Sequence, residues 1–338
     1  MRDLLVAGGG PVGLATALLA DRAGLSVTVV EPRTQPIDKA CGEGLMPGAV
    51  SALDALGVRP AGRSFRGIRY VADRQQATAD FRAGQGLGVR RLALQSSLTA
   101  AVSERGIPVL DRAVDTVEDD GRQVRAAGVC ARYLAAADGL HSPIRRLLGL
   151  DAASRPPVRF GLRQHFAVAP WSQYVEVHWT RDVEAYVTPV DEGLVGVAIL
   201  TSRREPFDVQ LAGVPALRQR LPVSAATSVR GAGPLRQRST ARVCGRVLLV
   251  GDAAGYVDAL TGEGIAVGVA CARALVEAVV ADDPASYEAS WRAASRRYRW
   301  LTESLLWARN HRAAARTIVP GARLLPGVFP TLVNQLAR

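Results

Sequence analysis

The sequence predicts an α/β fold, and three observations carry this prediction. Residues 1–35 contain an apolar strand at Asp3–Ala7, a helix at Leu14–Ala23 and a second apolar strand at Ser26–Val30. This order is typical of a parallel sheet covered by helices. From Tyr287 onward the pattern is helical and arginine-rich. Between them, short segments with β-branched or alternating residues predict a second sheet, at Ser64–Ala72, Ala77–Arg82, Val158–Val168, Tyr174–Trp179, Glu184–Pro189 and Leu194–Leu200.

The first strand runs directly into a glycine-rich turn, GGGPVG at residues 8–13. In a Rossmann-like unit, Gly8 permits the tight turn, Gly10 lets the backbone approach a pyrophosphate, and Gly13 lets helix and strand pack closely. Glu31 ends the second strand, where an acidic residue accepts hydrogen bonds from ribose hydroxyls. The unit predicts a dinucleotide site without separating FAD from NAD. Its candidate cofactor contacts are Gly8, Gly10, Pro11, Val12, Gly13, Glu31 and Arg33.

A second motif, DGLHSPIRR at residues 138–146, follows a short apolar strand at Tyr133–Ala137. It resembles the DGxxSxxR pattern of flavin-dependent aromatic hydroxylases, in which this segment lies near the pyrophosphate and is implicated in NAD(P)H binding. Ser142 is suited to cap the following helix, and Arg145 to supply a cation to a phosphate. The resemblance implies that Asp138, Gly139 and Arg145 contact the cofactor.

A third motif follows the buried strand at Val247–Val250. GDAAG at residues 251–255 precedes TGEGI at residues 261–265, which opens an alanine-rich helix reaching about Ala281. In the same family, the aspartate of the GD motif contacts the ribityl chain or ribose, and the N–H groups of the helix start point at the flavin ring. The implied cofactor contacts are Gly251, Asp252, Gly262, Glu263, Gly264 and Ile265.

A fourth segment, starting at Arg91, resembles the RxxLxxxL helix of the family. We expect Arg91 to reach toward the flavin, Leu94 and Leu98 to fill the core, and Gln95 to be exposed. Together the four motifs resemble the superfamily of FAD-dependent monooxygenases and geranylgeranyl reductases, which has the fold of para-hydroxybenzoate hydroxylase and also contains flavin halogenases. The cofactors implied are FAD and, as its reductant, NAD(P)H.

The resemblance also implies the domain organisation. The Rossmann-like FAD-binding domain is discontinuous, at residues 1–65, 85–155 and 240–285. The inserted substrate domain, mainly an antiparallel sheet, takes residues 66–84 and 156–239, with breaks at Pro156-Pro157 and residues 191–193. Residues 286–338 form C-terminal helices, which we expect Pro320-Gly321 and Pro326-Gly327 to interrupt.

To predict the reaction, we compare this sequence with the motifs of each branch of the superfamily and note where it departs from them. Gly255 replaces a histidine that aromatic hydroxylases commonly have, and KACGEGL at residues 39–45 resembles the cysteine–glycine segment that geranylgeranyl reductases place beside the flavin. GLMPGA at residues 44–49 resembles the hydroxylases instead. Our first expectation is an NAD(P)H-using monooxygenase that hydroxylates a lipophilic or aromatic secondary metabolite through a flavin hydroperoxide. The alternative is a reductase of carbon–carbon double bonds. A halogenase and a non-catalytic flavin-binding partner rank lower.

Candidate residues for substrate chemistry come from the same two regions. In a double-bond reductase, Cys41 and Glu43 are candidates for the acid that supplies a proton, and Cys41 and Gly42 are also candidate flavin contacts. Polar residues on the expected sheet are candidates for the substrate pocket. These are His165, Glu176, His178 and Tyr186.

Composition excludes several other classes of protein. The net charge of +11 comes almost entirely from arginines that are spread along the chain without interleaved aromatic residues, so we expect no nucleic-acid partner. Contact with an anionic membrane surface stays open. The four cysteines have no metal-ligand spacing, and no apolar run is long enough to span a bilayer. We expect a cytoplasmic protein with a small-molecule substrate and no bound metal. The sequence does not indicate an oligomeric state.

Overall fold

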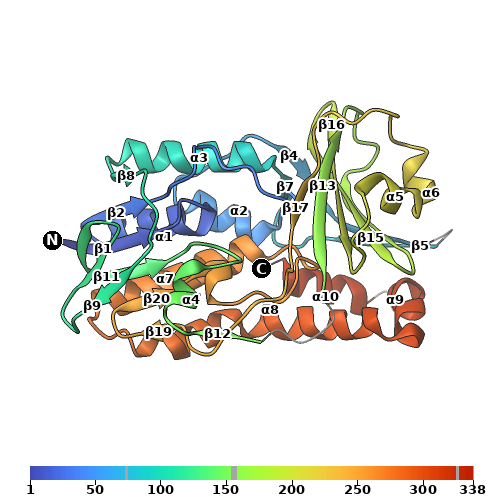
Figure 1. Cartoon of the computed structure of the whole chain (residues 1–338). Coiled ribbons are helices and arrows are strands. Elements are labelled where there is room, and N and C mark those ends of the chain that lie inside the picture. Colours follow the sequence, from blue (N-terminus) through green and yellow to red (C-terminus); the bar gives the residue numbers. More distant parts are fainter. Residues whose placement is uncertain (73–74, 154–157, 325–326, 338) are drawn as a thin grey trace.

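The computed structural model describes residues 1–338 except 73–74, 154–157, 325–326 and 338. The expected break at Pro156-Pro157 and the proline at 326 therefore lie outside the described residues. Two sheets stand side by side along the molecule, and the C-terminal helices run beneath both (Figure 1). The α/β fold class is confirmed, and each of the six segments expected to form the second sheet contains a strand.

The first sheet is the parallel one, with strand order β19-β20-β11-β1-β2-β8. The buried residues of its central strands β1, β2, β11 and β20 are apolar except for Thr28 of β2, as is typical of strands covered on both faces. Antiparallel β9 and β10 extend β11, and β19 closes one edge. The strands are β1 (Arg2–Ala7), β2 (Val27–Val30), β8 (Val109–Leu110), β9 (Val117–Asp119), β10 (Val124–Ala126), β11 (Val129–Ala136), β19 (Val243–Cys244) and β20 (Val247–Leu249).

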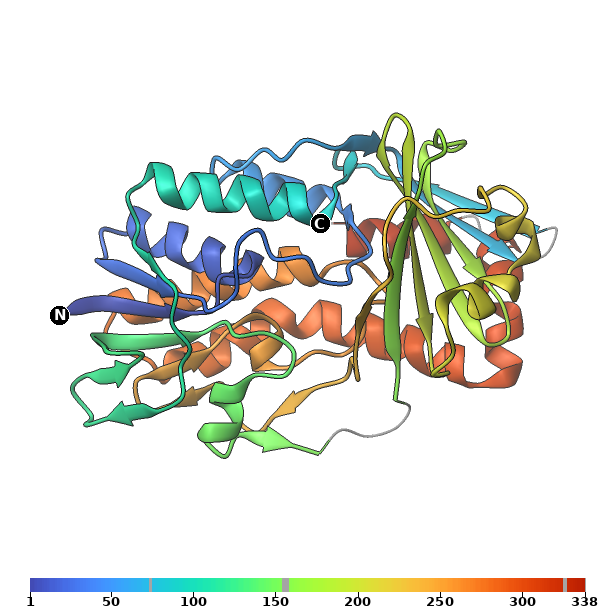
Figure 2. The same cartoon turned by 45° about the horizontal axis from the view of Figure 1, so that its top comes forward.

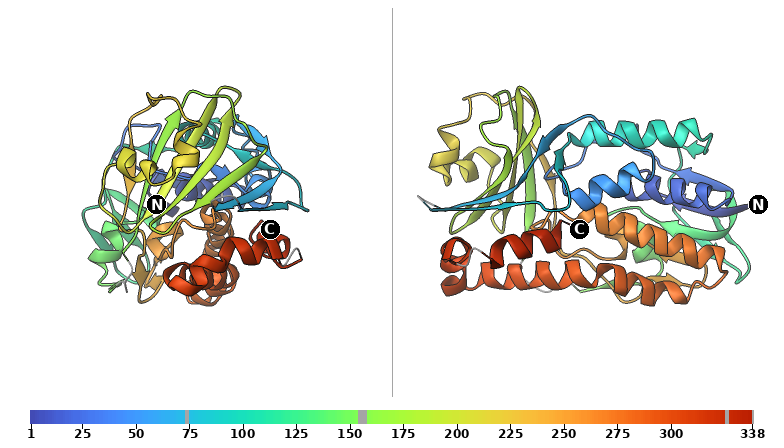
Figure 3. Two further views of the ribbon diagram at one scale, coloured as in Figure 1. Left: turned by 90° about the vertical axis from the view of Figure 1, so that its right-hand side faces the viewer. Right: turned by 180° about the vertical axis from the view of Figure 1, so that it is seen from behind.

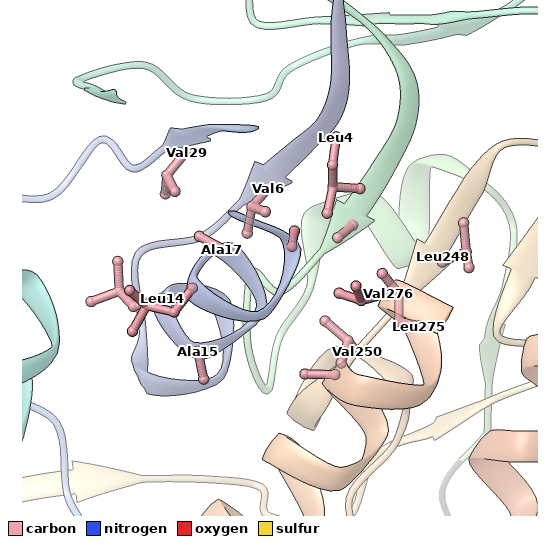
Figure 4. Close-up of a cluster of buried hydrophobic side chains, with 14 of the residues drawn as sticks. Leu4, Val6, Leu14, Ala15, Ala17, Val29, Leu248, Val250, Leu275 and Val276 are labelled. Carbon is pink, nitrogen blue, oxygen red and sulfur yellow. The ribbon is translucent and has the colours of Figure 1, made fainter. Parts of the chain in front are cut away.

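Helices that pack against one another cover this sheet and bury the largest hydrophobic cluster. Figure 4 shows Leu14 and Ala17 of α1 packing toward Val6 of β1, and Leu275 and Val276 of α7 beside Val250. The small side chains of α1 allow this close packing, since alanine and glycine occupy much of its buried face. The helices of this domain are α1 (Pro11–Arg22), α2 (Pro47–Asp54), α3 (Arg91–Glu104), α4 (Pro143–Leu147), the 3₁₀ turn η1 (Gly251–Ala254) and α7 (Gly264–Val280).

The second sheet has seven strands in the order β17-β13-β16-β15-β14-β5-β6. Every pair is antiparallel except β14 with β5. These two strands run parallel because the chain passes through the first domain between them, so no hairpin links them. Helices α5 (Phe207–Ala212) and α6 (Pro215–Arg218) cover the face turned away from the first domain (Figure 2). The strands are β5 (Gly67–Ala72), β6 (Gln75–Asp80), β13 (Phe160–Phe166), β14 (Tyr174–Trp179), β15 (Val183–Asp191), β16 (Leu194–Thr201) and β17 (Arg230–Ala232).

Two small sheets stand apart from the two large ones. One has three strands from residues 44–88, and the other has two strands. They consist of β3 (Gly44–Leu45), β4 (Arg63–Phe65) and β7 (Gly86–Gly88), and of β12 (Asp151–Ala152) and β18 (Arg238–Ser239).

Three helices form the C-terminal segment, α8 (Ser286–Asn310), α9 (Arg312–Leu324) and α10 (Val328–Leu336). They lie along one side of the molecule, below both sheets (Figure 3). The expected break at Pro320-Gly321 is wrong, because Pro320 lies inside α9. The neighbouring Val319 is buried in the cluster beneath the substrate sheet, and this packing offsets the hydrogen bond that an interior proline removes. Among the described helices, none is long and apolar enough to cross a membrane.

Candidate functional site

A cavity of about 240 Å³ opens where the parallel strands end, between the two sheets. The three glycine motifs follow β1, β11 and β20, so their turns meet at this edge, as the switch-point rule for open α/β sheets predicts. The structure thereby brings together residues from every motif. Of the candidate residues, the cavity is lined by Gly10, Pro11, Val12, Arg33, Cys41, Gly42, Glu43, Arg91, Asp138, Gly139, Gly251, Asp252, Gly262, Gly264 and Ile265.

The N-termini of two helices open into this cavity. Helix α1 begins after Gly10 and α7 after Glu263, and neither has a side chain that caps its first turn. The first N–H groups of each helix therefore have no partner within the helix, and they carry the positive end of the helix dipole. One end suits a pyrophosphate, and the other suits the electron-rich edge of a reduced ring.

Two glycines of the first turn act from behind the cavity. Gly8 has a φ of +112°, and a Cβ there would overlap the carbonyl oxygen of Ala137. A Cβ at Gly13 would overlap the carbonyl oxygen of Gly8. Gly10 differs, because nothing lies within 4 Å of the position of its Cβ, which leaves room for a ligand against the backbone. Gly8 and Gly13 thus shape the turn, and Gly10 faces the cavity.

Glu31 is buried behind the residues that line the cavity, and its partner Arg33 lines the cavity itself. Glu31 Oε2 accepts a hydrogen bond from the Gly9 amide at 2.8 Å, and Glu31 Oε1 accepts one from the Arg33 amide at 2.9 Å. Burial alone would raise the pKa of Glu31, but the hydrogen bonds from Arg33 and Gly9 outweigh burial and lower it. The carboxylate is therefore ionised, and it fixes both the turn and the Arg33 guanidinium.

Some residues of the DGxxSxxR segment line the cavity, and others stabilise the helix that follows it. Asp138 lines the cavity, its Oδ2 accepts a hydrogen bond from the Ile144 amide at 3.0 Å, and burial raises its pKa. Ser142 caps α4 by accepting from the Arg145 amide at 2.9 Å, as expected.

Arg145 does not reach the cavity. Its side chain is 1% exposed, pairs with Asp151, and donates to the carbonyl oxygens of Ala253 and Leu140 at 3.0 and 3.2 Å. This corrects the expectation that Arg145 meets a phosphate: its donors are used within the fold, where they tie α4 to η1.

Helix α3 differs from expectation at one residue. Arg91 lines the cavity, and Leu94 and Leu98 are buried in the core, as expected. Gln95, however, is fully buried, which corrects the expectation that it is exposed. Its Nε2 donates to the carbonyl oxygen of Gly9 at 2.6 Å and to Gln35 at 2.9 Å. The helix thus supplies a donor that the glycine turn needs.

The GD motif places one carboxyl at the cavity and one beneath it. Asp252 lines the cavity and lies 3.6 Å from the Lys39 ammonium. Glu263 does not line the cavity: it is 2% exposed at the start of α7, and its Oε2 is without a hydrogen-bond partner among the described residues. Burial raises the pKa of Glu263 to about 8, against an opposing effect of Arg297. Glu263 is therefore a buried carboxyl at the start of α7, outside the lining of the cavity.

The segment Cys41–Gly42–Glu43 forms the wall between the cavity and the substrate sheet. Cys41 is half-buried and lines the cavity. Glu43 adopts a φ of 59°, which costs a non-glycine residue about 1–3 kcal/mol. Its Oε1 accepts from the Arg91 amide at 2.8 Å, and its Oε2 lies 2.7 Å from Nε2 of His165. The strained loop is therefore held to α3 and to β13.

A second, apolar cavity of about 90 Å³ adjoins the first. Gly42, Ala198 and Leu200 line both, so the two are neighbours across the same wall. None of the described residues that line the second cavity carries a charge. Its other lining residues are Gly44, Met46, Ile68, Tyr70, Val175, Val177, Tyr186, Thr188, Ala259, Leu260, Thr261, Gly262, Val333 and Leu336.

The four candidates for the substrate pocket fall in three different places. Tyr186 lines the apolar cavity, and its hydroxyl donates to the carbonyl oxygen of Leu260 at 3.1 Å. His165 faces the first domain but is buried against Glu43.

Glu176 and His178 point to the opposite face of the sheet, which corrects their assignment to the pocket. Glu176 accepts from Trp171 Nε1 at 3.0 Å and lies 3.4 Å from His178. Burial would raise the pKa of Glu176, but the hydrogen bonds from His178 and Trp171 lower it to about 2. Because side chains alternate along β14, Val175 and Val177 face the cavity instead.

Comparison with known proteins identifies the family. Residues 1–282 match the model of a family described as FAD binding domain. A menaquinone reductase of Mycobacterium tuberculosis is 30% identical over 319 residues, which cover 81% of this chain and 76% of that protein. The chain belongs to the FAD-binding family. It is an FAD-dependent oxidoreductase with the fold of para-hydroxybenzoate hydroxylase, as the motifs predicted.

Two further similarities mark the range of this flavoprotein's relatives. A 6-methylpretetramide 4-monooxygenase of Streptomyces rimosus is 52% identical over 62 residues, which cover 18% of this chain and 15% of that protein. The crystal structure of a flavoprotein/dehydrogenase from Cytophaga hutchinsonii superposes with a TM-score of 0.87 at 18% identity, covering 99% of this chain and 92% of that chain. At this identity the structural similarity shows the fold alone.

The residues present fit FAD. Besides the uncapped starts of α1 and α7, two cavity residues have buried polar atoms without a hydrogen-bond partner among the described residues, Arg91 Nε and Asp138 Oδ1. Buried polar atoms normally have partners, so unpaired ones at a cavity wall indicate where a polar ligand binds. In this flavoprotein, α1, Arg33 and Asp138 would hold the phosphates and ribose, and Cys41, Gly42 and the start of α7 would border the ring.

No sequence motif marks a buried cluster of charged side chains in this flavoprotein. Arg159 pairs with Glu184 and with Asp258, the latter at 3.0 Å, and Arg309 of α8 also reaches Glu184. Burial raises the pKa of Asp258 to about 6. The cluster ties the substrate sheet to the loop before α7 and to α8. Only its three-dimensional neighbours reveal it, since its members are far apart in sequence and belong to no motif.

Proposed function

We propose that this flavoprotein reduces a carbon–carbon double bond in a lipophilic substrate, with NAD(P)H as the source of electrons. The observation that carries the proposal is the uncharged cavity next to the Cys41–Gly42 wall. Such a cavity favours an apolar group, because a charged group there would lose its hydration without gaining a partner. The menaquinone reductase relative, named for a lipid-soluble quinone, supports the same class of substrate.

With FAD held by the residues described above, its reduced form would supply the hydride for one carbon of the double bond. The chain must supply a proton to the other carbon. Both oxygens of Glu43 already have partners, the Arg91 amide and His165 Nε2. Because Arg163 can only donate, its contact with Nδ1 of His165 at 3.2 Å leaves the imidazole proton on Nε2, where it points at Glu43.

Glu43 is therefore an acceptor that positions the loop. Cys41, half-buried at the cavity wall, is the better proton donor of the two candidates. The strained backbone at Glu43 holds Gly42 against both cavities and Cys41 against the first, so a double bond that reaches from the apolar cavity past Gly42 would lie beside the thiol.

Anaerobic turnover tests this proposal. The holoenzyme would be mixed with a polyprenylated quinone and NADH or NADPH without dioxygen, and the products analysed by mass spectrometry. We expect a product whose polyprenyl chain, located by fragmentation, is heavier by two hydrogen atoms, with the rate reduced at least tenfold in Cys41→Ala and partly restored in Cys41→Ser. Absence of any reduced product from either nicotinamide or from chemically reduced enzyme would overturn the proposal.

A second candidate is monooxygenation of an aromatic substrate. The specific observation in its favour is the segment shared with the 6-methylpretetramide 4-monooxygenase. The same assay separates the two functions when it is repeated with isotopically labelled dioxygen. Incorporation of labelled oxygen into an aromatic product, together with no anaerobic turnover, would establish the oxygenase and exclude the reductase.

A further inference from the structure

The outer face of α8 exposes two large aromatic side chains. Trp300 and Trp307 are 65% and 60% exposed, and they lie seven residues apart, which places them on one face of the helix. The other described tryptophans are buried or half-buried. The ring of Trp307 packs on His311, with a centroid distance of 4.2 Å, so it is fixed in this outward position. Exposed tryptophans that share one face of a helix indicate a surface that contacts a membrane or another protein.

The same segment is strongly basic. Residues 286–338 contain nine arginines and two acidic residues, so most of the net charge of +11 lies in this part of the chain. Arg296, one turn before Trp300, is exposed. The two acidic residues pair with arginines, Glu288 with Arg292 and Glu303 with Arg236, at 3.0 and 3.1 Å. The helix therefore combines interfacial aromatic side chains with a positive field, which complements an anionic surface.

The segment also borders the apolar cavity. Val333 and Leu336 of α10 line that cavity from one side of the helix. On the same helix Val328 and Leu332 are exposed, and Leu324 at the end of α9 is 76% exposed. The C-terminal helices thus carry both exposed apolar side chains and part of the wall of the apolar cavity.

We propose that the C-terminal helices dock on an anionic lipid bilayer, with Trp300 and Trp307 at the level of the headgroups. Tryptophan favours this interface because its ring is apolar and its N–H is polar, and arginines near an anionic surface add electrostatic attraction. The helices lie on the bilayer without crossing it. That a lipophilic substrate then passes from the bilayer to the apolar cavity rests on the proposed function, whereas the docking itself does not.

Co-sedimentation of the holoenzyme with vesicles tests the docking. Vesicles of phosphatidylcholine alone would be compared with vesicles containing phosphatidylglycerol. We expect binding to the anionic vesicles only, weakened by added salt, and at least tenfold weaker for the Trp300→Ser/Trp307→Ser variant. Val223→Ser is the matched control, because Val223 is an exposed apolar residue of the substrate domain, 89% exposed. Flavin content and thermal unfolding of the variants show that the fold is intact.

Three outcomes would overturn the proposal. They are no binding to anionic vesicles, equal binding by the double variant, and a concentration-dependent dimer that the double substitution abolishes, which would assign the face to a second copy of the chain. The result is independent of the reaction. A protein that binds anionic vesicles but reduces no polyprenyl substrate would retain the docking and overturn the proposed reductase.

Discussion

The two cavities are neighbours across one wall, yet they are built in different ways. The cofactor cavity includes glycines of all three glycine motifs and the starts of two helices, and Glu31 holds its Arg33 from behind. The apolar cavity is lined by side chains from β5, β14, β15, β16 and α10. The first therefore depends on the absence of side chains at a few positions, and the second on their sizes. Substitutions on the two sides of the wall should separate cofactor binding from turnover.

The largest expected effect, on both stability and flavin content, comes from adding a single methyl group to the glycine turn. In Gly13→Ala the Cβ overlaps the backbone of Gly8, which cannot move without breaking the turn. We expect a loss of about 3 kcal/mol in the free energy of unfolding and no retained flavin. Gly10→Ala is the matched control, since its Cβ points into open space: the protein should fold normally and bind FAD more weakly. Thermal unfolding and the ratio of flavin to protein absorbance measure both, and retained flavin in Gly13→Ala would contradict this account.

The next largest effect distinguishes an arginine that stabilises the fold from one that lines the cofactor cavity. Arg145→Met removes a buried guanidinium and leaves Asp151 and two carbonyl oxygens without their donor. The free energy of unfolding should fall by about 2–3 kcal/mol, measured by urea denaturation of the apoprotein. Arg91→Met, at the cavity wall, should instead lower FAD affinity with a much smaller change in stability. If the two variants lost equal amounts of stability and of FAD affinity, the conclusion that Arg145 stabilises the fold without contacting the cofactor would be wrong.

On the other side of the wall, Val177→Phe tests the apolar cavity. The larger ring fills much of its volume, and we expect kcat/KM to fall about a hundredfold while FAD content is unchanged. His178→Gln is the matched control one residue along β14, where the side chain points to the opposite face and should change kcat/KM less than threefold. Equal losses from both substitutions would show that substrate does not bind in this cavity.

The sequence predicted the cofactor side well because the turns that approach a dinucleotide need glycine at fixed spacing. Of these motifs, Gly10, Pro11, Val12, Asp138 and Gly251 line the cavity. It failed on the substrate side because the burial of a polar side chain depends on partners elsewhere in the chain. Glu176 pairs with His178 and Trp171 away from the cavity.

Two further misses have the same cause. Gln95 is buried because a carbonyl of the distant glycine turn needs its donor, which helix periodicity does not reveal. No motif marks Tyr70 of β5 or Val333 of α10, which reach the apolar cavity through long-range packing.

The smallest expected effect concerns the carboxyl beneath the start of α7. Burial raises the pKa of Glu263 from 4.5 to about 8. The folded state therefore keeps a proton that the unfolded chain releases between these two values, and stability is lost as the pH rises through that window. Glu263→Gln removes this loss. The variant and the wild type should differ little at pH about 4.5, and at pH about 8.5 the variant should be the more stable of the two.

Urea denaturation at both pH values measures this difference. Glu277→Gln is the control, because Glu277 is exposed on the same helix and should show no such pH dependence. A stability difference that is equal at the two pH values would mean that Glu263 is already ionised in the folded protein. The start of α7 would then face the flavin ring with a negative charge beneath it, and the cofactor side of the wall would depend on a side chain as the substrate side does.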